Sequence, residues 1–145
     1  MKARHVLAIV VTAAATAWAL LSCNLMGTTI DQRISTFQSD MNTSDRSSAY
    51  QDFDPSMADY GSLKNGTYFS TIFPVPGTSY TFSVISESNT SAVIVQVNTG
   101  SMISGYTPPN CYLNLNMTEL SGNNWVIHSL SVGGTPTGGW TVAYQ

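Results

Sequence analysis

The sequence predicts an α+β domain in which helices come first and an antiparallel sheet follows. Three observations carry this prediction. Apolar residues recur with helical spacing after residue 29 and with strand alternation after residue 80. Hydrophobic residues make up 43% of the 145-residue chain and charged residues only 9%, so one packed core can form while the surface must be uncharged and polar. The length fits a single domain once a distinct N-terminal segment is removed.

That N-terminal segment, residues 1–22, is predicted to be an export signal. Lys2 and Arg4 give a basic start, and residues 6–21 form a charge-free apolar run. The run is shorter than the roughly 20 residues of a membrane-spanning helix. It ends in Leu-Leu-Ser-Cys, which resembles the lipobox of bacterial lipoproteins. The resemblance implies cleavage before Cys23 and lipidation of its thiol. An ordinary cleaved signal and a retained membrane helix are the alternatives.

The lipoprotein resemblance implies a location and a first partner. The protein would sit in the bacterial cell envelope, held to a membrane through the palmitate-type chains on Cys23, with residues 23–28 as a lipidated tether. Two or three acyl chains hold a protein durably where one holds it only marginally. Asn24 follows the cysteine, which favours the outer membrane or another periplasm-facing position.

Charge and cysteine content exclude several classes of function. The domain after residue 22 keeps only three cations, Arg33, Arg46 and Lys64, so nucleic acid is not an expected partner. We find no phosphate-binding glycine loop, paired-cysteine motif or metal-ligand cluster, and we therefore expect no cofactor and no metal. Cys111 has no second cysteine to pair with once Cys23 is lipidated. It is either a buried small residue or a thiol that pairs between molecules.

The helical half begins at Thr29, a predicted N-cap with Gln32 as its capping-box partner. Ile30, Ile34, Phe37 and Met41 then form one helix face. Further helical stretches are predicted over residues 45–53, 57–60 and 68–73.

The second half of the chain alternates with a period of two and predicts strands. Two hairpins are expected, each with a polar turn between its strands. The predicted strands cover residues 80–84, 92–97, 111–117 and 125–132. Residues 133–145 form a loop and a candidate edge strand that carries Trp140 and Tyr144.

Two segments resemble the nuclear-transport-factor-2-like (SnoaL-like) superfamily. They are IDQRISTFQSDMNTSDRSSAYQDFDP, beginning at residue 30, and YLNLNMTELSGNNWVIHSLSV, beginning at residue 112. The resemblance covers residues 29–132 and implies a cone, in which N-terminal helices pack on a curved antiparallel sheet. Members include dehydratases and isomerases, which use Asp/His pairs inside the cone, and non-catalytic binding or dimerising domains.

His128 is the single histidine after the export signal. It is either a structural or surface residue or the general base of an enzyme, and a base needs an oriented partner. The acids Asp52, Asp54 and Asp59 are interpreted as solvated groups or helix-end caps. We assign no catalytic residue.

The aromatic residues are expected to build the core or to line a pocket for an apolar ligand. Trp140 and Tyr144 are also candidates for an exposed patch that binds a partner. The candidate ligand-binding residues are Tyr50, Phe53, Tyr68, Trp125 and His128.

Three hypotheses of function follow from the sequence. The first is a lipid-anchored, non-enzymatic envelope domain that binds a small apolar ligand or an envelope protein. The second is a small isomerase- or dehydratase-type enzyme centred on His128. The third is a structural domain that associates with itself, for example as a homodimer. The interior of the fold discriminates among them.

Overall fold

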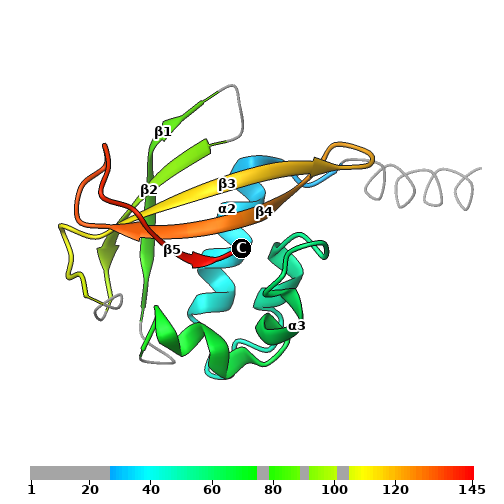
Figure 1. Ribbon diagram of the computed structural model, residues 1–145, viewed down its shortest axis with the longest axis horizontal. Helices are drawn as coiled ribbons and strands as arrows, with labels where there is room; N and C mark the ends of the chain where they lie inside the picture. The colour runs from blue at the N-terminus through cyan, green and yellow to red at the C-terminus, as the bar shows by residue number, and fades with distance from the viewer. Residues whose placement is uncertain (1–26, 75–78, 89–91, 101–104) are drawn as a thin grey trace, which may run out of the picture.

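The computed structural model describes residues 27–74, 79–88, 92–100 and 105–145, and its main feature is one antiparallel sheet (Figure 1). The sheet has five strands in the order of the chain, so each strand pairs with the one before it. The strands are Thr81–Glu87 (β1), Ala92–Thr99 (β2), Tyr112–Leu120 (β3), Asn124–Gly133 (β4) and Thr141–Tyr144 (β5). All four predicted strands and the candidate edge strand therefore form. The export segment and Cys23 lie outside the described residues.

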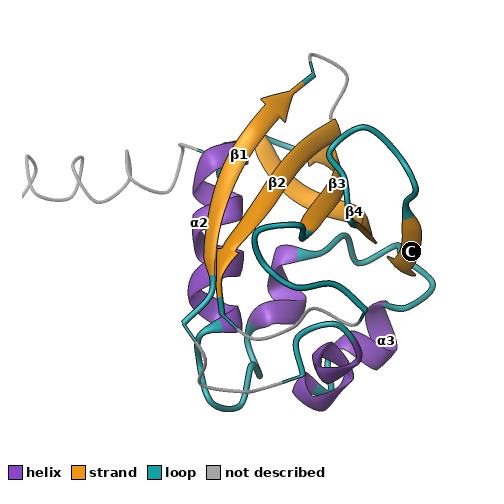
Figure 2. Cartoon of the chain, turned by 90° about the vertical axis from the view of Figure 1, so that its left-hand side faces the viewer, coloured by secondary structure: helices purple, strands orange, loops and turns teal. Residues whose placement is uncertain are grey.

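Helix α2, Ile30–Met41, confirms the helix that the capping box predicts. The Gln32 amide donates to Thr29 Oγ1 at 3.2 Å, and the Thr29 amide donates to Gln32 Oε1 at 3.0 Å. Asn42, just after the helix, exchanges two hydrogen bonds with the backbone of Tyr80. These bonds fasten the end of α2 to the start of β1, and Figure 2 shows the two elements side by side.

The other helices are short. They are the 3₁₀-helices Ala49–Asp52 (η1) and Gly66–Thr71 (η2) and the single α-helical turn Tyr60–Leu63 (α3). The predicted helix over residues 45–53 is wrong for its first half, because Arg46 adopts a left-handed backbone with φ of 53°. That conformation turns the buried Arg46 guanidinium inward, where it donates to the carbonyls of Met41 and Phe73.

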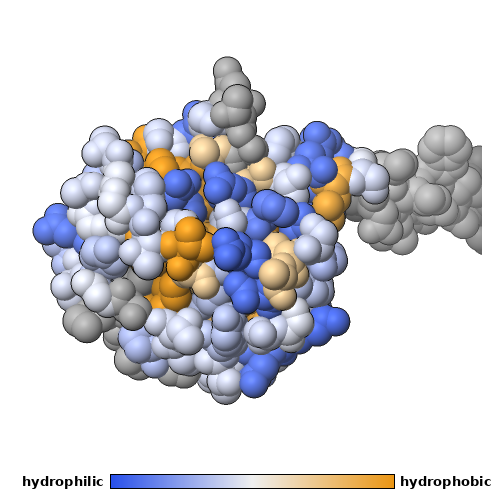
Figure 3. Space-filling model, in the orientation of Figure 1, coloured by the Kyte–Doolittle hydropathy of each residue, from blue (hydrophilic) through white to orange (hydrophobic). Residues whose placement is uncertain are grey.

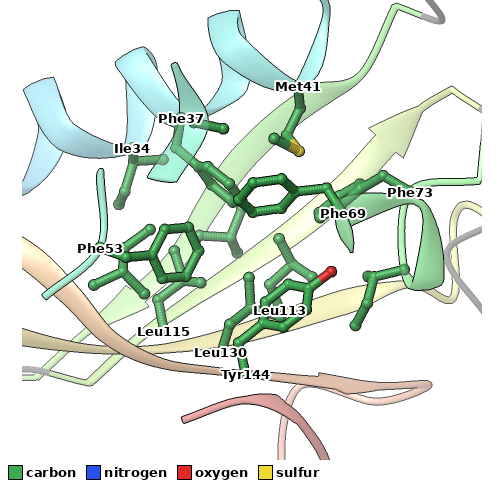
Figure 4. Close-up of a cluster of buried hydrophobic side chains, with 14 of the residues drawn as sticks. Ile34, Phe37, Met41, Phe53, Phe69, Phe73, Leu113, Leu115, Leu130 and Tyr144 are labelled. Carbon is green, nitrogen blue, oxygen red and sulfur yellow. The ribbon is translucent and has the colours of Figure 1, made fainter. Parts of the chain in front are cut away.

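The core lies between these helices and the sheet and is rich in aromatic rings (Figure 4). Phe37 of α2 is at its centre and contacts rings from the η1 end, from η2 and from β1. Leu113, Leu115 and Leu130 line the sheet side. Cys111 is fully buried, which confirms its interpretation as a small core residue.

The predicted cone with N-terminal helices packed on a curved sheet is wrong. The described residues form an open five-stranded sheet, and its helical part is one 12-residue helix followed by short turns. The chain belongs to the α+β class only in this loose sense. The physical reason lies in residues 43–74, where the left-handed Arg46 and Pro55 interrupt helical continuity and leave turns in place of a second long helix.

The tail also differs from expectation. Tyr144 is 1% exposed and contacts Phe53 and Phe69, so it is a core residue and not part of an exposed patch. The edge strand β5 pairs with β4 as the sequence suggests, and Tyr144 contributes to the core.

Candidate functional site

A histidine–aspartate pair lies where strand β4 bulges. Asn116 faces Ser129 and Met117 faces Ile127 across the β3–β4 ladder, which leaves His128 without an opposite residue. Such an extra residue reorients its side chain relative to the regular alternation. His128 Nδ1 lies 2.8 Å from Asp54 Oδ2, and 55% of the histidine side chain remains exposed.

Asp54 is held in place by the backbone on both sides. Its amide donates to the Ile127 carbonyl at 2.9 Å, and its Oδ1 accepts from the Ser56 amide at 2.8 Å. Burial raises the pKa of Asp54, but the Ser56 amide and His128 outweigh burial, so this pKa lies below its ordinary value. Asp54 is therefore ionised at neutral pH, and His128 Nδ1 carries the proton that it shares.

A second buried acid, Asp52, belongs to a structural cluster. Arg33 Nη1 lies 2.8 Å from Asp52 Oδ1, and the two side chains are 11% and 1% exposed. Arg33 Nε also donates to the Trp125 carbonyl at 2.8 Å, and Arg33 Nη2 donates to Asn124 Oδ1 at 3.2 Å. One guanidinium therefore joins α2, η1 and the start of β4. We call these four residues the Arg33 cluster.

The pKa of Asp52 is shifted in the opposite direction to that of Asp54. Burial raises the pKa of Asp52 to about 7, although the Arg33 hydrogen bond and charge lower it, and the Asp40 carboxylate adds to the increase. Within the described part of the chain, Asp52 Oδ2 is buried without a hydrogen-bond partner. Asp52 therefore gains a proton as the pH falls below about 7, and Oδ2 is the oxygen without a competing donor among the described residues.

A groove of about 470 Å³ lies between η2, β5 and the segment before β3. Its buried floor includes Ile72 and Val132, and half-buried Tyr68 and Tyr106 stand at its sides. Val142, which is 57% exposed, lies at its surface. We call this the β5 groove. Figure 3 shows apolar surface among hydrophilic residues where Figure 1 places β5.

The polar groups behind the groove already have partners. Thr71 Oγ1 donates to the Tyr68 carbonyl at 3.0 Å and lies 3.1 Å from the Tyr144 hydroxyl. Burial raises the pKa of Tyr144, so its phenol stays neutral. The Thr71 hydroxyl is therefore satisfied internally, and the apolar and aromatic side chains of the lining suit an uncharged apolar ligand.

Two glycines let aromatic rings approach the strand end beside the groove. A Cβ on Gly133 would lie 2.8 Å from the Trp140 ring, and one on Gly134 would lie 3.2 Å from the Tyr106 ring. The absence of side chains at Gly133 and Gly134 thus leaves room for the rings of Trp140 and Tyr106. The pair lacks the strand–loop–helix context of a phosphate-binding loop.

The five candidate ligand-binding residues do not form one site. Tyr68 alone among them lines the β5 groove. Phe53 is 1% exposed in the core, and Tyr50 packs edge-to-face on Tyr60. Trp125 is half-buried with its carbonyl in the Arg33 cluster, and His128 faces solvent beside Asp54.

Sequence reasoning missed the burial of two acids in this region and two residues that line the groove. It interpreted Asp52 and Asp54 as solvated groups or helix-end caps, whereas both are buried. It also missed the groove residues Tyr106 and Val142, which come from segments that the sequence treats as loop and tail.

Within residues 27–74, 79–88, 92–100 and 105–145, no three His, Cys, Asp or Glu side chains come together as a metal would require. None of the helices in these ranges combines the length and the apolar character that a membrane span needs. Comparisons with models of protein families, with curated proteins and with solved structures gave no match to this chain.

Proposed function

We propose that this protein is a lipid-anchored, non-enzymatic domain of the bacterial cell envelope that binds a small apolar ligand in the β5 groove. The groove carries the proposal, because its volume of about 470 Å³ matches a small-molecule site and its lining combines apolar and aromatic side chains with two threonines and carries no charge. The anchor rests on the lipobox-like residues 20–23.

The ligand proposal is tested by photolabelling of the full-length protein in membranes. A small apolar probe, trifluoromethyl phenyl diazirine, is activated by light, and the modified peptides are mapped by mass spectrometry. We expect labelling of the peptides that contain Tyr68 and residues 141–143. Absence of labelling there, with labelling elsewhere in the domain, would reject the groove as a ligand site.

Two variants of equal charge sharpen this test. Val142→Asp places an anion at the groove, whereas Ile85→Asp places one on β1, where the side chain is 49% exposed and outside the groove lining. We expect Val142→Asp to reduce groove labelling about tenfold, because an apolar ligand would then border an ionised group. Ile85→Asp should leave labelling unchanged. Equal labelling of both variants would contradict specific binding.

The anchor is tested separately by metabolic labelling with radioactive palmitate. We expect label on the wild-type protein and none on Cys23→Ala, which should also remain uncleaved at residue 22 or be cleaved elsewhere. A labelled, mature Cys23→Ala protein would disprove the assignment of Cys23.

A second candidate function is acid–base chemistry at His128. The observation in its favour is the 2.8 Å bond to Asp54, which orients the ring as a base requires. His128 does not line the β5 groove, so the two candidates can be separated by mutation. Loss of biological function in folded His128→Gln protein, tested by complementation of a deletion strain, would favour this candidate over ligand binding.

A further inference from the structure

The described chain begins against the turn between β3 and β4. The Trp125 amide donates to the Thr28 carbonyl at 2.9 Å, which fastens residue 28 to the start of β4. Gly27 lies so close to the turn that a Cβ there would come within 2.1 Å of the Asn123 carbonyl oxygen and 2.3 Å of that of Gly122. The tether therefore leaves the domain at this turn, and only glycine fits where it does so.

The tether is too short to let this turn move far from the anchor. Four residue steps separate Cys23 from Gly27. A fully extended chain of that length spans at most about 14 Å. The β3–β4 turn must therefore stay within about 14 Å of the point where residue 23 is held.

The β5 groove lies at the other end of the same strand. Val132 of the groove is eight residues along β4 from Asn124 at the turn. At the usual rise of a strand, this separation is about 27 Å. Figure 1 shows the β3–β4 turn and the β4–β5 connection at opposite ends of the molecule.

We infer that the β3–β4 turn faces the headgroups of the anchoring membrane and that the β5 groove lies at the end of β4 that is far from it. This inference rests on the membrane anchor of the proposed function and adds an orientation to it. The turn residues, 121–124, are uncharged hydroxyl, amide and glycine groups that meet a headgroup layer without charge repulsion. The groove then receives its ligand from the aqueous compartment across from the membrane and not from the acyl chains of the anchoring leaflet.

The orientation is tested by cross-linking to lipid in membranes from cells. Photoreactive benzoylphenylalanine replaces either Ser121, in the turn, or Thr137, in the β4–β5 connection, both of which are exposed. The readout is radiolabelled phospholipid joined to the protein after irradiation. We expect severalfold more lipid on the protein labelled at residue 121. Equal amounts, or more at residue 137, would overturn the inference.

A tether variant provides the matched control. Gly27→Val cannot keep the close approach to Asn123 and should release the tether from the turn, so the difference between the two positions should shrink. A difference that survives Gly27→Val would show that tether docking does not set the orientation. Cross-linking to phospholipid can be measured even if the export segment is retained as the anchor. Palmitate labelling tests lipidation of Cys23 separately.

Protein absent from the membrane fraction would overturn both the anchor and the orientation.

Discussion

Asp52 and Asp54 stand on either side of buried Phe53, and the regions around them differ in almost every electrostatic respect. Asp52 is 1% exposed beside Arg33, and burial raises its pKa to about 7. Asp54 is 8% exposed and shares its carboxylate with the Ser56 amide and His128, which hold its pKa below the ordinary value against the effect of burial. Asp52 is therefore paired with the permanent cation Arg33, and its pKa is nevertheless raised.

This difference shows that the pKa of a buried carboxylate depends on the number of its hydrogen-bond donors as well as on the charge of its partner. Asp54 has donors at both oxygens, from Ser56 and from His128. In the described structure only one oxygen of Asp52 has a donor, while its second oxygen is buried without one. A buried oxygen without a donor favours protonation, because a proton removes the charge that the interior cannot solvate.

The largest expected effect comes from removing the cation of the Arg33 cluster. Arg33→Ala takes the donor away from Asp52, the Trp125 carbonyl and Asn124 at once. We expect the free energy of unfolding to fall by about 3 kcal/mol, because buried acceptors lose their partner. The measurement is urea unfolding of the full chain at pH 7.

Lys64→Ala is the matched control for Arg33→Ala, because Lys64 is an exposed cation whose ammonium lies over the rings of Tyr50 and Tyr60. It should change the unfolding free energy by less than about 1 kcal/mol. Equal losses in the two variants would mean that the Arg33 cluster does not join the elements as its geometry indicates.

The next effect is a dependence of stability on pH that has opposite signs at the two acids. Between its ordinary value of 3.8 and about 7, folded Asp52 binds a proton that the unfolded chain has released. Stability therefore falls as pH rises through this range, by about 1 kcal/mol for each pH unit. Asp52→Asn should remove this slope.

For Asp54 the lowered pKa means that stability is lost as pH falls through and below the ordinary value.

Unfolding curves recorded at several pH values separate the two acids. Asp54→Asn should keep the slope between pH 3.8 and about 7 and lose the decline at the acidic end. If Asp52→Asn keeps the full slope below pH 7, another group is responsible, and the contrast between the two acids is weaker than the structure indicates.

Elements defined by local chemistry were predictable from the sequence. The capping box of Thr29 and Gln32 and the apolar positions Ile34 and Phe37 predict α2, since these signals lie within one or two turns of helix. The alternation in β2 and β3 likewise predicts strands whose apolar residues face the core.

The arrangement of those elements was not predictable from local signals. Both a cone and an open sheet follow from helices that precede two hairpins, and the left-handed backbone of Arg46 has no marker in a sequence where glycine or asparagine would be the usual signal.

The partners of the buried acids come from far along the chain. Arg33 and Asp52 are 19 positions apart, and Asp54 and His128 are 74 positions apart. Tyr68 was the one predicted ligand-binding residue that lines the groove, because the groove is built from segments that are far apart in the sequence and that only the fold brings together.

The smallest expected effect is at the exposed end of the second pair. His128→Gln removes a hydrogen bond to Asp54, but 55% of the histidine side chain already faces solvent, where water replaces the lost partner. We expect the unfolding free energy to change by less than about 1 kcal/mol, and we expect photolabelling of the β5 groove to be unchanged, because His128 does not line it. Urea unfolding and the diazirine probe measure both quantities on one preparation. A loss as large as that of Arg33→Ala would show that the exposed pair carries as much of the fold as the buried one. Reduced groove labelling at normal stability would connect His128 to the ligand and unite two sites that the structure keeps apart.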